Sequence, residues 1–175
     1  SHIHPDHCSD ETLKHINKDI PVYIHLYHSK FLKFKLERLG FKVIELKNNR
    51  RTQLHTNAYL NIFAADNCNP ELCYKLSGCA DLNAKEGSQQ LDTLSLIDDG
   101  TSVLMNVNDC PIELAQSTFK DIKKQYDKIN VLLTGYGGAG PYPQCFENLN
   151  LEQKKIAGEA KEKQFLNQAI KYIDE

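Results

Sequence analysis

No apolar run in the chain approaches the roughly 18 residues that a membrane-spanning helix needs. Nor is there an excess of basic residues, because 21 Lys and Arg stand against 23 Asp and Glu, for a formal net charge of −2. General binding to nucleic acid or to a membrane surface requires such an excess, so neither partner is expected. Linkers, repeats and low-complexity tracts are also absent, which favours one domain over residues 1–175.

The six cysteines lack the paired C-x2-C spacing of a zinc ribbon. Three of them are isolated in the sequence, and a chain of 175 residues can bury a core without disulfides. No signal peptide is visible either. We therefore expect a reducing, cytoplasmic compartment with thiols that are buried or bind metal. A secreted, disulfide-bonded protein is the alternative.

Alternation of strand and helix patterns predicts an α/β domain. The run Asp98-Asp99-Gly100 separates two β-rich segments and is typical of a hairpin turn, which favours a mixed or antiparallel sheet over a purely parallel one. The strands are expected at 22–25, 41–46, 58–64, 91–97, 101–107 and 131–134. The helices are expected from Ser9 to about Asn17, over 31–39 with Ser29 as its cap, over 111–126, and after Asn150, where Gln153 completes a capping box.

The first seven residues contain three histidines and one aspartate, as His2-Ile-His4-Pro-Asp6-His7. In an extended strand, residues i and i+2 point to the same side, so His2 and His4 can converge on one ion. Pro5 ends the extended run and brings Asp6 and His7 to a second position nearby. Imidazole and carboxylate together suit zinc, iron or manganese. Purification tags, by contrast, run histidines consecutively.

The segment HIHPDH resembles the signature of the metallo-β-lactamase-fold hydrolases. The segment VLMNVNDCP, which contains Asp109, is similar to the strand-borne aspartate that bridges two metals in that superfamily. A third segment, VLLTGYGGAGPYPQCF, resembles the branch that includes the carboxy-terminal domain of CMP-N-acetylneuraminate hydroxylases.

The resemblance implies an αββα sandwich and a hydrolase that uses a metal-activated hydroxide. It implies two zinc ions, with iron or manganese as alternatives. His2 and His4 would bind the first metal, Asp6 and His7 the second, and Asp109 would bridge them. Asp6 would also orient the hydroxide and act as the catalytic residue. The branch implies a small anionic substrate that bears phosphate or carboxylate, such as a sugar nucleotide.

One expected ligand of the family is missing. Related sequences carry a histidine in a D-x-x-H-P-E-like stretch, where this chain has Asn69. Cys68 is a candidate substitute ligand. The alternatives for the cysteine-containing insertion at about 65–90 are an inserted lobe with packed thiols or a separate metal cluster. Three other histidines can supply a ligand, but each is expected to be an ordinary strand or loop residue: His25, His28 and His55.

The resemblance places further strands before HIHPDH and more chain after the last helix. We therefore expect the chain to be truncated at both ends, and its fold to be completed by a partner segment or by homo-oligomerisation.

The glycine-rich segment Gly135–Gly140 spells G-x-G-x-x-G, but Pro141 and Pro143 follow at once and argue against a dinucleotide-binding helix. We expect instead a loop at the mouth of the metal site. Its candidate substrate-binding residues are Gly137, Gly138, Tyr142 and Gln144.

Two other functions are alternatives to a hydrolase. A component of a Rieske-type hydroxylase would need C-x-H and C-x2-H pairs, and neither occurs in these residues. A non-catalytic metal-binding domain would be consistent with Asn69, since a site that lacks one ligand binds metal weakly.

Overall fold

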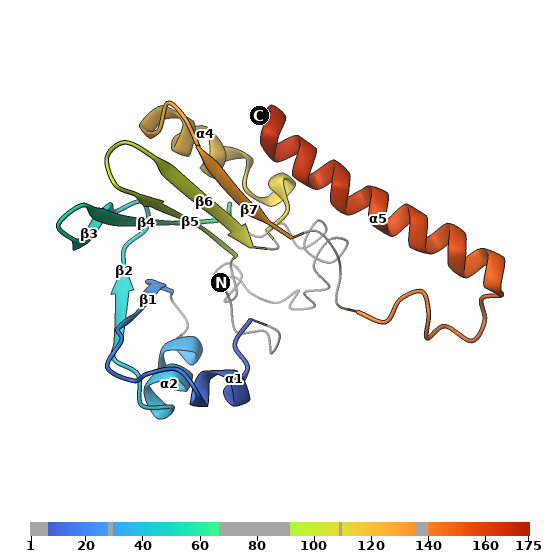
Figure 1. The fold of residues 1–175 in the computed structure, drawn as a ribbon, viewed down its shortest axis with the longest axis horizontal. Helices are drawn as coiled ribbons and strands as arrows, with labels where there is room; N and C mark the ends of the chain where they lie inside the picture. The colour runs from blue at the N-terminus through green and yellow to red at the C-terminus, as the bar shows by residue number, and fades with distance from the viewer. Residues whose placement is uncertain (1–6, 28–29, 67–91, 109, 136–139) are drawn as a thin grey trace. The chain divides into compact units, whose positions relative to one another are not determined.

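The computed structural model describes residues 7–27, 30–66, 92–108, 110–135 and 140–175. It is a mixed α+β structure whose larger sheet is mostly antiparallel (Figure 1). The chain divides into two compact units, residues 1–133 and residues 134–175. In order, the elements before the second unit are α1 (Asp10–Lys14), β1 (Val22–His25), α2 (Phe31–Arg38), β2 (Val43–Leu46), β3 (Thr52–His55), β4 (Ala58–Ala64), β5 (Thr93–Asp98), β6 (Val103–Asn108), the 3-10 turn η1 (Ile112–Leu114), α4 (Gln116–Gln125) and β7 (Val131–Thr134).

Two sheets form in the first unit. β1 and β2 pair in parallel, and the other strands form a five-stranded sheet in the order β3-β4-β5-β6-β7. The expected hairpin is confirmed, since β5 and β6 pair antiparallel with Asp98 opposite Val103. Its turn contains Gly100 at φ 86°, and the Asp99 carboxylate accepts hydrogen bonds from the backbone N–H groups of Thr101 and Ser102.

One face of the five-stranded sheet is covered by α4. Alternate residues of the central strands are almost fully buried on this face, as the period of two in a strand requires: Asn61, Phe63, Leu94, Leu96, Met105 and Val107. The end of α4 is tied to this face, because Asn61 Nδ2 donates to the Tyr126 hydroxyl at 3.3 Å. Thr118 of α4 also donates its hydroxyl to the carbonyl of Ala64 at 2.8 Å.

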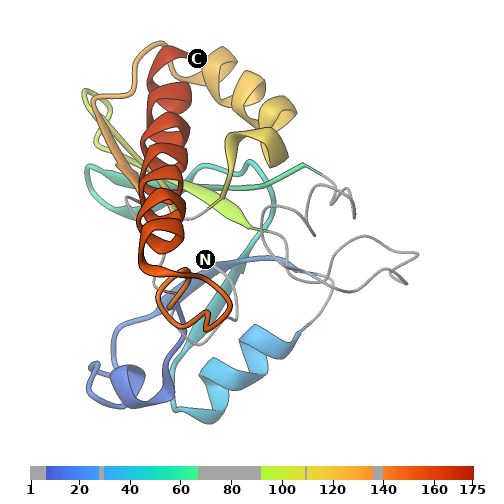
Figure 2. The same cartoon turned by 90° about the vertical axis from the view of Figure 1, so that its right-hand side faces the viewer.

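The β1–β2 pair packs against the opposite face of the sheet. Leu46 of β2 forms a buried cluster with Leu60 and Ile62 of β4, and Tyr23 packs against its edge. The far side of β1–β2 is covered by α2, through a second cluster that includes Ile24 and Leu36. The order of layers in this unit is therefore helix, two-stranded sheet, five-stranded sheet, helix (Figures 1 and 2).

The start of α4 is capped by a residue from a distant part of the sequence. Its own N-cap residue, Ala115, has no side chain that can accept a hydrogen bond. Instead the Asp66 carboxylate accepts from the backbone N–H of Ser117 at 2.8 Å and of Thr118 at 2.9 Å. A carboxylate at a helix start satisfies N–H groups that lack helical partners and complements the helix dipole. Asp66 thus joins the end of β4 to α4.

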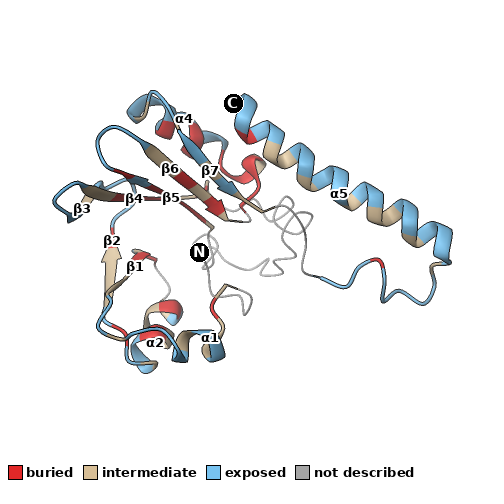
Figure 3. Ribbon diagram, in the orientation of Figure 1, coloured by how far each residue is buried: buried red, intermediate tan, exposed pale blue. Residues whose placement is uncertain are grey.

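The second unit consists mainly of α5 (Leu151–Asp174), a helix of 24 residues. The expected capping box is confirmed, because Asn150 and Gln153 each accept a hydrogen bond from the other's backbone N–H at 2.9 Å. Figure 3 shows that most of the helix is exposed, including apolar residues such as Leu151 and Ile173. In the described part of the chain, no helix combines the length and apolar character needed to cross a bilayer.

Replacing Asp66 by Ala should lower the free energy of unfolding by about 1–2 kcal/mol, because two N–H groups of α4 lose their acceptor. Urea denaturation followed by circular dichroism measures this loss. Asp121→Ala is the matched control, since its carboxylate pairs only with exposed Lys124 on the surface of α4. A loss from Asp66→Ala no larger than that of the control would contradict the cap.

Candidate functional site

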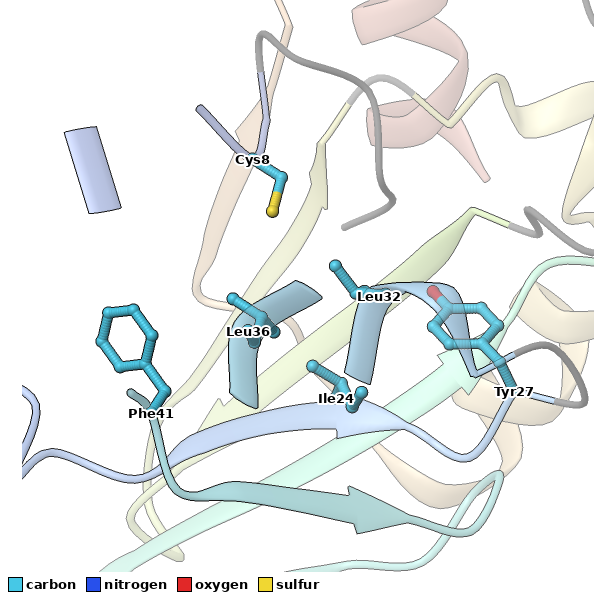
Figure 4. Close-up of a cluster of buried hydrophobic side chains, with 6 residues drawn as sticks. All are labelled: Cys8, Ile24, Tyr27, Leu32, Leu36 and Phe41. Atoms are coloured by element: carbon cyan, nitrogen blue, oxygen red, sulfur yellow. The ribbon is translucent and has the colours of Figure 1, made fainter. Parts of the chain in front are cut away.

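The carboxyl end of the histidine-rich motif is anchored in the first unit. His7 lies half-buried in the turn before α1, and the next residue, Cys8, is 4% exposed. Figure 4 shows Cys8 directed toward the α2 side of the core, where it belongs to the cluster that includes Ile24 and Tyr27. Burial raises the pKa of the Cys8 thiol, so it acts as a neutral packing group. Lys35 also donates to the Cys8 carbonyl at 2.6 Å.

Most of the predicted metal ligands lie outside the described residues, as do the two predicted loop glycines. They are His2, His4, Asp6, Cys68, Asp109, Gly137 and Gly138. Within the described residues, no group of three or more His, Cys, Asp or Glu side chains could hold a metal ion. Of the predicted ligands, His7 is the one that the structure describes.

The chain turns sharply at the end of β6, next to the predicted bridging aspartate. Asn108 has φ 51°, a left-handed conformation that asparagine tolerates better than most residues. Its N–H donates to the Asn106 Oδ1 atom at 2.9 Å, and the Cys110 N–H donates to the Val107 carbonyl at 3.0 Å. These two bonds fix the backbone on both sides of position 109.

A pocket of about 180 Å³ opens where β1 faces the five-stranded sheet. We call it the inter-sheet pocket. Its polar lining residues come from β1, β5 and β6: Tyr23, His25, Thr93, Ser95, Asn106 and Asn108. Its apolar lining residues are Ile24, Leu60 and Ile62. The strand register explains the grouping, because Ile62, Ser95 and Asn106 are direct cross-strand partners on one face.

His25 is the titratable residue in this pocket whose polar side-chain atoms are buried with few hydrogen bonds. Both ring nitrogens are buried, and neither makes a well-formed hydrogen bond to any described residue. Burial lowers the pKa of the imidazole from its usual 6.5, and the nearby Asn48 side chain offsets only part of this effect. His25 is therefore neutral at pH 7, with one N–H donor and one nitrogen acceptor.

His25 also connects the inter-sheet pocket to the end of the histidine-rich motif. Its ring lies edge-on to the Tyr27 ring, with 5.1 Å between the centroids. Tyr27 belongs to the same buried cluster as Cys8. Tyr27 thus belongs to the buried cluster of Cys8 and also contacts His25, which lines the pocket together with Asn108. The sequence predicts an ordinary strand histidine at position 25. The polar residues that alternate at 93 and 95 and at 106 and 108 are the signal for a polar pocket.

The two predicted substrate contacts that can be described, Tyr142 and Gln144, lie in the second unit and are exposed. Their loop is held against α5 by lysine side chains that donate to backbone carbonyls. Lys161 donates to the Tyr142 carbonyl at 3.1 Å, and Lys154 donates to the Gln144 carbonyl at 2.9 Å. The Tyr142 ring meets the Phe146 ring edge-on, with 5.1 Å between the centroids. Both side chains therefore sit on a loop that α5 supports.

We expect an NMR titration to place the pKa of His25 below 6.5, because burial penalises the charged ring. At pH values between this lowered pKa and 6.5, the His25 ring is protonated in the unfolded chain and neutral in the folded chain. The free energy of unfolding therefore falls as the pH decreases through that window. Denaturation midpoints between pH 7.5 and 5.5 measure the effect.

His25→Gln should remove this part of the pH dependence, whereas His55→Gln, at an exposed position in β3, should retain it. A His25 pKa at or above 6.5, or the same pH dependence in both variants, would show that the ring is not held neutral by burial.

Comparisons of the chain with protein-family models, with curated proteins and with solved structures gave no match. The chemistry of the site must therefore be inferred from the chain's own residues. Those residues are the anchored end of the histidine-rich motif, the turn after β6, and the inter-sheet pocket between them.

Proposed function

We propose that the protein is a metal-dependent hydrolase that acts on a small anionic substrate. The donor set of HIHPDH and Asp109 motivates the proposal, because three imidazoles and two carboxylates suit a pair of zinc ions, with iron or manganese as alternatives. The layer order of the first unit is consistent with an αββα sandwich of the metallo-β-lactamase type. A cytoplasmic location is part of the same proposal.

The proposal is supported by the place in the first unit of the residues that adjoin His7 and Asp109. Cys8 belongs to the buried cluster that also contains Tyr27, Tyr27 contacts His25, and His25 and Asn108 line one pocket. A shared metal site would need the two segments to approach each other, since its ligands lie about 100 residues apart in the sequence.

The proposed roles are those that the resemblance to metallo-β-lactamase-fold hydrolases implies. His2 and His4 hold one cation, Asp6 and His7 hold the second, and Asp109 holds both. When bound, such a pair of cations lowers the pKa of a water molecule toward about 7. Asp6 would orient such a water molecule and accept its proton. Cys68 is the proposed substitute for the missing histidine ligand.

An anionic substrate fits the proposed loop contacts. Backbone N–H groups of Gly137 and Gly138 can bind phosphate or carboxylate oxygens, as successive N–H groups do in anion-binding loops. Tyr142 and Gln144 supply a hydroxyl and an amide at the end of the same loop. A phosphate- or carboxylate-bearing sugar nucleotide is the proposed class of substrate.

The test is metal content by plasma mass spectrometry after incubation with Zn²⁺ and removal of free ion. We expect about two equivalents per chain, as in other two-metal sites. His4→Ala should leave at most one equivalent, and Asp109→Ala should reduce both, because it removes the shared ligand. His55→Ala and Asp121→Ala, at exposed positions, are the matched controls and should keep the full content.

Hydrolysis of a phosphodiester, a phosphomonoester and a lactone by the zinc-loaded protein is measured in parallel. Asp6→Asn should lower the rate by roughly 10²–10⁴-fold, in line with loss of a general base. Stoichiometric metal that survives both His4→Ala and Asp109→Ala, or a chain that binds none, would refute the assignment.

A further inference from the structure

The inter-sheet pocket has a lining that is polar but uncharged. With His25 neutral, none of its described lining residues carries a formal charge. A charged group that entered the pocket would lose its hydration without gaining a counter-charge, which costs several kcal/mol. The lining therefore selects against phosphate, carboxylate and ammonium groups.

A purely apolar occupant is disfavoured for the opposite reason. It would cover the hydroxyl and amide groups of the lining without offering them hydrogen bonds, and buried polar groups without partners are costly. Asn106 uses its Oδ1 atom to accept from the Asn108 N–H, which leaves its Nδ2 group as a donor to an occupant. Ser95 is the cross-strand partner of Asn106 on the neighbouring strand, and its hydroxyl can donate or accept.

The opposite wall of the pocket is apolar, because Leu60 and Ile62 line it from β4. The occupant therefore has carbon-bound hydrogens on one side and hydrogen-bonding groups on the other. Its size is set by the volume of about 180 Å³. An engineered protein cavity of about 150 Å³ holds one benzene molecule, so the pocket has room for a single six-membered ring.

We propose that the inter-sheet pocket binds an uncharged, hydroxyl-bearing six-membered ring of the size of one monosaccharide, with Ser95 and Asn106 as the residues that determine specificity. Asn108 also lines the pocket and directly precedes Asp109. The ring would thus be a part of the substrate that does not react, held next to the bond that is cleaved. This last step rests on the proposed function, whereas binding of the ring does not.

The experiment is isothermal titration of the 175-residue chain, treated with chelator, with glucose, galactose, mannose and N-acetylglucosamine. At least one of these should bind saturably, and glucose 6-phosphate and cyclohexanol should bind at least tenfold more weakly than it. Histidine ring resonances are followed by NMR during the same titration. Those of His25 should shift on binding, and those of exposed His55 should not.

Two pairs of matched variants test the residues. Asn106→Ala should weaken binding about tenfold or more, and Asn57→Ala, at an exposed turn, should change it less than twofold, since loss of a hydrogen-bonding partner costs about 1–3 kcal/mol. Ser95→Ala should weaken binding several-fold, whereas Ser102→Ala, in the exposed hairpin turn, should not. Circular dichroism identifies any variant that fails to fold, and the Ser95 pair then provides the test.

The proposal is overturned if no sugar binds, if cyclohexanol or the phosphorylated sugar binds as tightly, or if both variants of a pair lose affinity equally. Failure here is distinguishable from failure of the proposed function. If a sugar binds but the chain holds no zinc in the metal-content experiment, only the proposed hydrolase function is refuted. If the chain holds stoichiometric metal but no sugar binds, only the proposed ring subsite is refuted.

Discussion

The packing of one sheet on the other is the constraint on which the site depends. Leu46 of β2 meets Leu60 and Ile62 of β4, and burial of each such side chain contributes about 1.5–3 kcal/mol. The contact uses only the apolar part of this face of the sheet. The neighbouring strands present Ser95 and Asn106 on the same face, where both residues line the inter-sheet pocket. The pocket is thus a result of where the apolar side chains on this face end.

Much of the fold could be predicted because its signals are local. The strand at 58–64 is a mostly apolar run that is largely buried, and the observed β4 has the predicted bounds. The helix after Asn150 carries its own capping box. β3 (Thr52–His55) was missed, because four largely exposed residues carry no apolar pattern. The helix predicted from Pro111 begins as a 3-10 turn, and α4 itself starts at Gln116, where the cap comes from a residue 50 positions away.

The site was less predictable, for a related physical reason. The histidine-rich motif is recognisable because its spacing is local, but convergence with Asp109 depends on contacts between distant segments. In the sequence, His25 is an ordinary strand histidine. The structure shows that it lines one pocket with Asn106 and Asn108. Pairing of β5 with β6 and packing of β1 on the sheet create that environment. Neither relation can be read from the residues around position 25.

The end of β4 and the start of β5 are joined by more than the chain between them. Ala64 pairs with Thr93, the Ala65 N–H donates to the Asp92 carbonyl at 2.8 Å, and Asp66 is fixed to α4. Both ends of the connection at 67–91 are therefore held by the scaffold. Residues 66 and 92 are thus placed by the sheet and by α4, through contacts made entirely by residues outside that stretch.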